Sequence, residues 1–182
     1  MSGFSISASG GKRTDRQWSR GALPERQNQQ NAIDLFTDVG LGTPRVAILS
    51  AVETVTSKIP STIDAAALCK MAERGQITGG ILDGPLAFDN AIDAEAAKIK
   101  GIESPVAGRA QILVVPDLEA GNMLAKNLSF LAQADAAGIV LGARVPIILT
   151  SRADSVRTRM ASCAVAVLYA DARRRAAILL AA

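Results

Sequence analysis

The sequence has no histidine among its 182 residues. This absence excludes Ser-His-Asp and Cys-His nucleophiles, histidine general bases and histidine metal ligands. The two cysteines, Cys69 and Cys163, are too few for a disulfide framework or a four-cysteine zinc site. Both lie in apolar segments, so we expect buried structural thiols in a reducing compartment. Aromatic residues make up only 3% of the chain, which predicts an aliphatic core and argues against base stacking on nucleic acid.

Long apolar runs are also missing. The longest, Met160–Ala170, has eleven residues and contains Ser162, whereas a membrane-spanning helix needs about 20 residues. The N-terminus lacks the apolar segment of a signal peptide. We therefore expect a cytoplasmic protein with no membrane partner.

The positive charge is confined to the N-terminus. The net charge is +3, and residues 1–30 hold five basic and two acidic side chains, so the other 152 residues are neutral. A general nucleic-acid surface is therefore not expected, and neither is a nucleic-acid partner. We predict a flexible basic leader over residues 1–27 and one α/β domain over residues 28–182, because this length suits a single domain.

From residue 28 onward, apolar runs of strand length alternate with helical patterns. Strands are predicted at residues 45–51, 78–82, 111–115, 137–141 and 145–150, and helices at 31–39, 61–74, 88–100, 119–134 and from 153 to the C-terminus. Ser61 and Asp64 resemble a capping box, and Asp83-Gly84-Pro85 predicts a turn. The alternation predicts an α/β fold with a mostly parallel sheet flanked by helices, whose ligands bind beyond the carboxyl ends of the strands.

The clearest candidate site is the segment Leu149–Asp154, where a predicted strand turns into a helix. Ser151 and Asp154 have the spacing of a capping box, so a purely structural role explains them. The same geometry also suits an anion, because a helix start offers free N–H groups and Arg152 adds a planar fork of donors. Both interpretations stay open, and they are compatible.

Two further segments follow predicted strands. In the first, Asp117 precedes Asn122 and Lys126, which share one helix face. Either Asp117 caps the helix and the other two lie on its solvent-exposed face, or the three side chains orient a polar ligand. The second, Asp83–Asn90, is either a tight turn or the polar lining of a cleft. No Walker loop and no GxGxxG occurs, and no carboxylate spacing typical of a metal site is present, so no metal is expected.

Four segments, in this order along the chain, carry a resemblance to a known family: PRVAILSAVETV, DGPLAFDNAI, ILVVPDLEAGNMLAK and GARVPIILTSRADS. Over about residues 28–169 the chain resembles the C-terminal half of the phosphate acetyl/butyryl transferase family. It looks most like the form fused behind an enoyl-CoA hydratase-like domain in bifunctional proteins.

The resemblance implies transfer of an acyl group between CoA and phosphate, with CoA as a substrate and no other cofactor. It implies a fold similar to the isocitrate and isopropylmalate dehydrogenases, incomplete here relative to the full family: a second domain plus a return segment that completes the first. By resemblance, Ser151 and Arg152 match a Ser-Arg pair that contacts phosphate and the thioester, and Asn122 and Lys126 match a cleft motif. Arg144 is a weaker phosphate ligand.

Two departures from the family follow from the same comparison. The family's aspartate base corresponds to Thr158, which leaves Asp154 as the nearby carboxylate. The chain is also shorter than full members, so we expect a homodimer or higher oligomer with exposed apolar residues at Val165, Val167 and Leu168. The alternatives are a non-catalytic CoA-binding, phosphate-binding or dimerisation remnant, and a related dehydrogenase, which the missing nucleotide motif disfavours.

Overall fold

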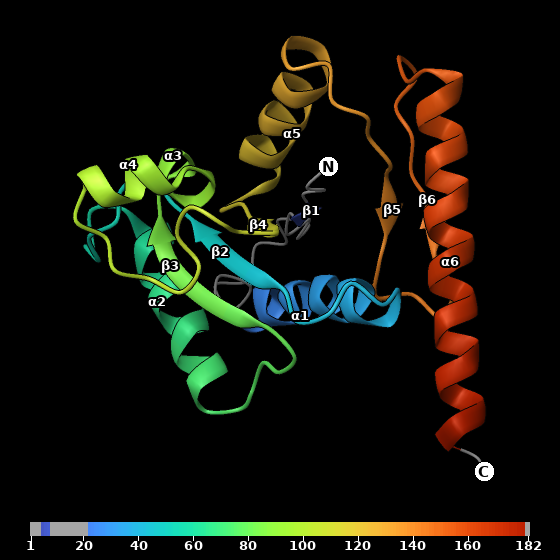
Figure 1. The fold of residues 1–182 in the computed structure, drawn as a ribbon, viewed down its shortest axis with the longest axis horizontal. Coiled ribbons are helices and arrows are strands. Elements are labelled where there is room, and N and C mark those ends of the chain that lie inside the picture. Colours follow the sequence, from blue (N-terminus) through green and yellow to red (C-terminus); the bar gives the residue numbers. More distant parts are fainter. Residues whose placement is uncertain (1–4, 8–21, 181–182) are drawn as a thin grey trace, which may run out of the picture.

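The computed structural model describes residues 5–7 and 22–180 and shows an α/β fold built on a parallel sheet flanked by helices (Figure 1). The elements in chain order are β1 (Ser5–Ser7), α1 (Ala22–Asp38), β2 (Arg45–Leu49), α2 (Pro60–Glu73), β3 (Ile81–Leu86), α3 (Phe88–Ile92), α4 (Ala94–Ile99), β4 (Ile112–Val114), α5 (Leu118–Lys126), the single π-helical turn η1 (Asn127–Leu131), β5 (Ile139–Val140), β6 (Ile147–Ile148) and α6 (Val156–Leu180). The predicted fold class is confirmed. No helix in the described part of the chain is long and apolar enough to cross a membrane.

The main sheet has the strand order β1-β4-β2-β3, and all three pairings are parallel. The central strand β2 is apolar on both sides because both of its faces are covered. Val46 and Ile48 pack into the core beneath α1 and α2, whereas Ala47 and Leu49 pack into a second core that α3 and α4 help to form. The carboxyl ends of β2 and β4 therefore lie between two packed layers of side chains, one on each face of the sheet.

Helix α1 starts earlier than the predicted residue 31. It begins at Ala22, so the predicted boundary between leader and domain at residue 27 falls inside a helix. The Arg26 side chain donates a hydrogen bond to the Gln76 carbonyl, and the Gln30 amide donates to the Thr78 carbonyl, so the helix is tied to the loop before β3. Residues 1–4 and 8–21 of the predicted leader lie outside the described residues.

The predicted capping box at Ser61 and Asp64 is wrong. Helix α2 begins at Pro60 after Ile59, and no side chain caps it. Proline suits the first helical position because its missing N–H needs no partner there. The Ser61 hydroxyl instead lies 2.8 Å from the Ser50 hydroxyl at the end of β2, which fastens the helix start to the sheet edge.

Strand β3 runs through the predicted turn at Asp83-Gly84-Pro85 rather than ending before it. Proline is tolerated because β3 is an edge strand with an irregular register against β2. A Cβ atom on Gly84 would lie 2.7 Å from the carbonyl oxygen of Ile48, so glycine is the residue that permits this close approach of the two strands. The Cys69 thiol donates to the Gly84 carbonyl at 3.6 Å, and burial raises the pKa of that thiol to about 12.

The predicted helix 88–100 is two helices. The Asp93 side chain accepts hydrogen bonds from the N–H groups of Glu95 and Ala96, so it caps α4 and separates it from α3. The predicted helix 119–134 ends at Leu131, in the turn η1.

The C-terminal segment lies to one side of the sheet (Figure 1). Strands β5 and β6 are shorter than predicted, pair antiparallel and join no other strand of the described chain. Helix α6 contacts both of them and also α1, and the buried Ser162 hydroxyl accepts a hydrogen bond from the Gly138 N–H. Val167 and Leu168 are 66% and 58% exposed, as expected, but Val165 is half-buried, so the prediction is wrong for that residue. Cys163 is exposed rather than buried.

Candidate functional site

An open cavity of about 400 Å³ lies where β2 and β4 end, beneath α5. Parallel α/β sheets commonly bind ligands at this edge. In Figure 1, α5 rises from the carboxyl end of β4 and stands above the sheet. The side chains around the cavity are mostly apolar and none is charged: Leu49, Ser50, Ala51, Phe88, Val115, Pro116, Ala120, Met123, Leu124 and Asn127.

Local sequence explains how this cavity is built. After β2, the Ser50 N–H donates to the Leu86 carbonyl at 2.9 Å, which holds the end of β2 beside the end of β3. After β4, Pro116 is followed by Asp117, whose carboxylate accepts a hydrogen bond from the Ala120 N–H at 2.7 Å. Asp117 is thus the N-cap of α5. This cap fixes where the chain leaves the sheet and where α5, which forms one wall of the cavity, begins.

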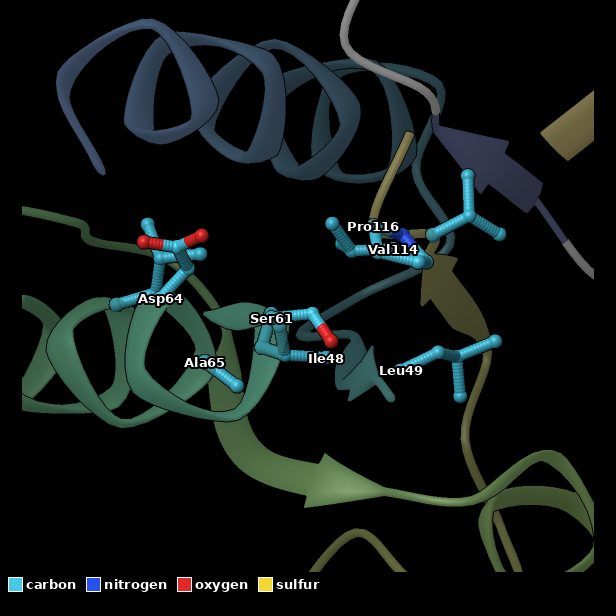
Figure 2. Close-up of a pocket in the computed structure, with 9 residues that line it drawn as sticks. Ile48, Leu49, Ser61, Asp64, Ala65, Val114 and Pro116 are labelled. Atoms are coloured by element: carbon cyan, nitrogen blue, oxygen red, sulfur yellow. The ribbon is translucent and has the colours of Figure 1, made fainter. Parts of the chain in front are cut away.

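A second hollow opens between α2 and the sheet, and Figure 2 shows the side chains around it. Its volume is about 20 Å³, which is close to the space one water molecule needs. Ser61 and Asp64 lie on its α2 side, and burial raises the pKa of Asp64. The hollow is too small for a substrate.

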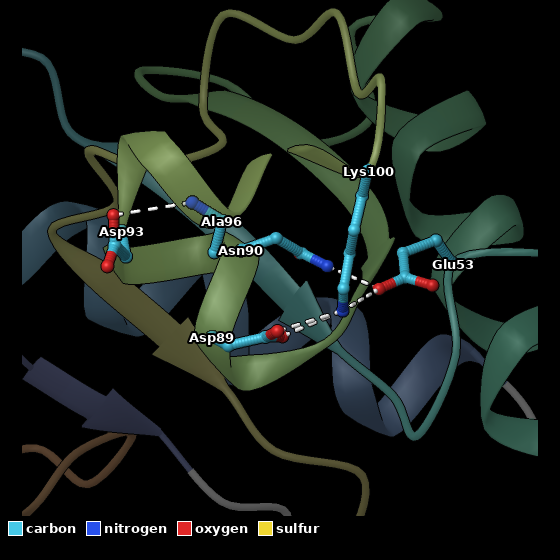
Figure 3. A network of polar contacts seen from close by, with 6 residues as sticks. All are labelled: Glu53, Asp89, Asn90, Asp93, Ala96 and Lys100. Atoms are coloured by element: carbon cyan, nitrogen blue, oxygen red, sulfur yellow. Dashed lines mark hydrogen bonds and ion pairs between the residues drawn. The ribbon is translucent and has the colours of Figure 1, made fainter. Parts of the chain in front are cut away.

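A polar network lies beside the larger cavity (Figure 3). The Lys100 ammonium is 2.8 Å from Glu53 Oε1 and 2.9 Å from Asp89 Oδ2, and the Asn90 amide also donates to Glu53. The hydrogen bonds from Lys100 lower the pKa of Glu53 and of Asp89, and those two carboxylates raise the pKa of Lys100.

This network joins two loops. Glu53 follows β2 and Asp89 lies in the first turn of α3, next to Phe88 at the cavity wall. Within the predicted segment Asp83–Asn90, the interpretation as a turn is wrong, since Asp83 lies within β3. Lys100 was not singled out from the sequence, because nothing in the spacing of Glu53, Asp89 and Lys100 shows that they meet.

Of the candidate residues of α5, Asn122 is exposed and Lys126 is half-buried. The Lys126 ammonium lies 5.6 Å from the centre of the Phe130 ring, a cation–π contact. Neither side chain lines the cavity, whereas Met123, Leu124 and Asn127 from the same stretch do. Sequence reasoning missed these three, although Met123 and Leu124 are apolar residues between polar ones on a strand-end helix, which was an available signal.

The turn at Ser151–Asp154 is built differently from the predicted helix start. Helix α6 begins at Val156, and its first turn is capped by the Ser155 hydroxyl, which accepts from the Thr158 N–H at 3.1 Å. The expected cap at Ser151 is therefore wrong. Asp154 Oδ2 accepts from the Ser151 N–H at 2.6 Å, and the Ser151 hydroxyl accepts from the Ala153 N–H at 3.4 Å.

Two candidate arginines are free of ion pairs among the described side chains: Arg152 in this turn, and Arg144 in the loop between β5 and β6, at the opposite end of β6 (Figure 1). Arg152 and Arg144 are both exposed, and none of the ion pairs formed by residues 22–180 includes either of them. No hydrogen bond or ion pair in that range joins the turn to Asp117, Asn122 or Lys126. The structure thus places the predicted residues in three places: at α5, in the turn before α6, and, for Arg144, in the loop between β5 and β6. Residues 22–180 contain no cluster of three acidic or cysteine side chains suited to a metal ion.

Comparison with known proteins gives consistent matches. The sequence pattern described as phosphate acetyl/butaryl transferase matches residues 27–167. A phosphate acetyltransferase of Rhizobium meliloti is 84% identical over 153 residues, which cover 84% of this chain and 48% of the relative. A phosphate butyryltransferase of Clostridium acetobutylicum is 46% identical over 140 residues, which cover 77% of this chain and 46% of the relative.

Solved structures agree with these matches. A branched-chain phosphotransacylase from Enterococcus faecalis V583 superposes with a TM-score of 0.74 at 32% identity, over 81% of this chain and 54% of that one. The chain spans about half the length of the curated relatives it matches. The resemblance to the hydratase-fused form stays a prediction. On the match over residues 27–167, the chain belongs to the phosphate acetyl/butaryl transferase family.

Proposed function

We propose that this chain carries part of a phosphate acyltransferase site, for the reaction of acyl-CoA with phosphate to give acyl phosphate and CoA. The observation that carries the proposal is the family match over residues 27–167, which includes the strand ends and the α5 wall that surround the cavity. CoA is a substrate here, and the proposal needs no metal or further cofactor. The proposal includes a cytoplasmic location.

In either direction, the reaction forms one bond to the acyl carbon and breaks another. A phosphate oxygen attacks the thioester carbonyl carbon, the carbon–sulfur bond breaks, and CoA leaves as a thiolate that takes up a proton. The negative charges of phosphate and of the carbonyl oxygen in the tetrahedral intermediate need positive groups or hydrogen-bond donors. In the reverse direction the CoA thiol must lose its proton before it attacks.

In this proposal Arg152 binds phosphate, because its guanidinium is exposed and none of the ion pairs within residues 22–180 uses it. Arg144 is the weaker phosphate candidate, because it lies at the opposite end of β6 from Ser151. The Ser151 hydroxyl still has its proton to donate, since the hydrogen bond to Ala153 uses its oxygen as the acceptor. Ser151 is therefore suited to the carbonyl oxygen of the thioester.

Asp154 is the proposed base for the CoA thiol. One of its carboxylate oxygens is held by the Ser151 N–H, which fixes the carboxylate in the same turn as Ser151 and Arg152. Thr158, at the position of the family's aspartate, shares a hydrogen bond with the Ser155 hydroxyl and has no carboxylate. On α5, Asn122 and Lys126 are proposed to contact polar parts of the substrates, and Asp117 acts by capping the helix.

The phosphate site is tested by thermal unfolding in increasing phosphate. Phosphate at ten times its Kd adds about 1.4 kcal/mol to the free energy of unfolding, which raises the melting temperature by a few degrees. Arg152→Ala should abolish that increase, whereas Arg109→Ala, at an exposed arginine on another loop, should retain it. Equal phosphate stabilisation in both variants would place the anion elsewhere.

Activity is measured by CoA release from acetyl-CoA and butyryl-CoA with phosphate. We expect release that depends on both substrates and that falls in Asp154→Asn and in Ser151→Ala. The acyl group is left open by the relatives, because their names include both acetyl and butyryl transfer. Release by the wild-type chain that Asp154→Asn leaves unchanged would exclude Asp154 as the base.

A second role, self-association, is favoured by the exposed apolar face of α6 and β6. Ile147, Met160, Val167 and Leu168 are between 49% and 66% exposed. The two elements are in contact, and exposed apolar side chains grouped in this way are typical of interaction sites. We propose that the chain forms a homodimer or higher oligomer through this face. Light scattering that shows a monomer at all concentrations tested would exclude it.

A further inference from the structure

One ammonium group connects two sides of the cavity that come from different parts of the chain. The Lys100 Nζ atom lies 2.8 Å from Glu53 Oε1, and 3.0 Å and 2.9 Å from Oδ1 and Oδ2 of Asp89 (Figure 3). Glu53 lies two residues after Ala51, and Asp89 directly follows Phe88, and both Ala51 and Phe88 line the cavity. Lys100 itself follows the end of α4 and does not line the cavity. Its ammonium therefore sets how far apart these two sides lie.

The segment after β2 has few other attachments. Its two ends, at Ser50 and Thr56, are hydrogen-bonded to hydroxyl groups of α2. Between these ends, within the part of the chain that the structure describes, residues 51–55 make no hydrogen bond to another residue except those that the Glu53 carboxylate accepts. A segment with so few hydrogen bonds is locally mobile unless a side chain fixes it. The Glu53 carboxylate is the group that fixes this one.

The other donor to Glu53 belongs to the core. Asn90 is 0% exposed, and its side-chain amide donates to the same Oε1 atom that Lys100 contacts. The Asn90 carbonyl accepts from the Gly108 N–H at 2.7 Å, and the next residue, Ala91, is part of the buried core. Helix α3 is thus the fixed side of the contact, and the segment after β2 is the side that it holds.

We propose that Lys100 is a positioning residue of the candidate site, which acts through Glu53 to hold residues 51–55 against α3. In this role it keeps Ala51 and Phe88 at the separation that substrate binding needs. The proposal rests on the phosphate acyltransferase function and adds a residue outside the cavity on which that function depends. Arginine in place of Lys100 can still donate to both carboxylates, whereas methionine is an unbranched side chain without a charge or a donor.

The first test measures backbone order without any substrate. Nitrogen-15 relaxation gives an order parameter for each N–H group, about 0.85 in rigid backbone and below about 0.6 where the chain is flexible. In the full chain, Lys100→Met should move the order parameters of residues 51–55 from the rigid value toward the flexible one, and Lys100→Arg should retain the rigid value.

Lys98→Met is the matched control for this measurement. Lys98 is an exposed residue of α4, and none of the ion pairs formed within residues 22–180 includes it. The control should leave the order of residues 51–55 as it is in the wild type. Unchanged order in Lys100→Met, or an equal loss in Lys98→Met, would overturn the proposal.

The second test asks whether this order serves the site, by calorimetric titration with acetyl-CoA. A segment that occupies its binding position for only about a tenth of the time raises the apparent Kd about tenfold. We expect binding up to about tenfold weaker in Lys100→Met, and the wild-type affinity in Lys100→Arg and Lys98→Met. Wild-type binding that Lys100→Met leaves unchanged would overturn the positioning role alone. A wild-type chain that binds no acetyl-CoA would contradict the phosphate acyltransferase function and overturn the positioning role with it.

A double variant tests whether Lys100 acts through Glu53. Glu53→Gln keeps an oxygen that can accept from Asn90 but removes the charge that pairs with Lys100. Glu53→Gln should weaken acetyl-CoA binding by itself, and adding Lys100→Met to it should cause little further loss, because residues of one network are not additive. Fully additive losses in the double variant would show two independent effects and overturn the action through Glu53.

Discussion

Replacing Gly108 by alanine tests whether the loop before β4 is held against α4 by close backbone contact. Gly108 has a φ of +74°, and its N–H donates to the Asn90 carbonyl at 2.7 Å. A Cβ atom built there would lie 2.4 Å from the Ala94 Cα atom and 2.7 Å from its nitrogen, so backbone would have to move. Gly101 is the matched control, because its φ is +67° and a Cβ atom there meets nothing within 4 Å.

The two variants share one cost and differ in another. Each puts alanine in the left-handed region, which costs about 1–2 kcal/mol. Gly108→Ala also overpacks a closed contact, which adds about 1–3 kcal/mol. The contact lies over Val106, Ala107 and Ala110, which belong to the core beneath the cavity. We expect Gly101→Ala to lower the free energy of unfolding by about 1–2 kcal/mol and Gly108→Ala by about 2–5 kcal/mol.

Urea unfolding followed by circular dichroism measures both values in one series. A lower midpoint with an unchanged slope identifies a change in stability rather than in the unfolded state. If Gly108→Ala is no more destabilising than Gly101→Ala, the close approach of this loop to α4 does not constrain the fold, and the steric reasoning is refuted.

Three further outcomes follow from the described contacts. Leu68→Ala, at a side chain 1% exposed on α2, should cost about 2–5 kcal/mol in urea unfolding, whereas Ile63→Ala, 46% exposed on the same helix, should cost far less. The lowered pKa of Glu53 means that its contribution to stability is present at neutral pH and is lost as the pH falls below the ordinary glutamate value of 4.5; Glu53→Gln should therefore flatten the acid side of a plot of stability against pH. Ser155→Ala should lower stability by about 1 kcal/mol as a lost N-cap, and thermal unfolding should show a smaller loss for Ser151→Ala.

The strands that carry the fold were predictable because their burial is complete. Arg45–Leu49 and Ile112–Val114 lie inside the two predicted apolar runs, since a strand covered on both faces contains little else. Strand β3 was misplaced because Asp83-Gly84-Pro85 carries strong turn chemistry. Tertiary context overrides it, since the strand is at the sheet edge and Gly84 permits contact with Ile48.

Local signals also failed where two caps compete over a few residues. Ser151 and Asp154 have capping-box spacing, yet Ser155 caps α6, because the pair closes a turn of its own just before the helix. In the same way Asp93 divides a continuous helical pattern into α3 and α4. Sequence spacing identifies side chains that are able to cap a helix, but it does not decide which of two neighbouring candidates forms the cap.

The location of the candidate site was predictable only in part. The rule that ligands bind beyond the carboxyl ends of parallel strands pointed to the loops after all the predicted strands. The loops after β2 and β4 do surround the cavity, whereas the clearest candidate segment, Leu149–Asp154, does not line it. Its lining by Phe88 and Met123, and the meeting of Glu53 with Lys100, depend on how three separate helices pack, and sequence spacing carries no information about that.

The two cysteines differ in reactivity, so a thiol reagent can label the chain at a single site. Cys69 is mostly covered and its pKa is about 12, so it offers almost no thiolate to an alkylating reagent at neutral pH. Cys163 is exposed on the outer part of α6, between residues of the apolar face. A maleimide fluorophore will therefore attach at one position without any engineered cysteine. Its emission and its anisotropy then report, in the native sequence, whether another polypeptide covers α6.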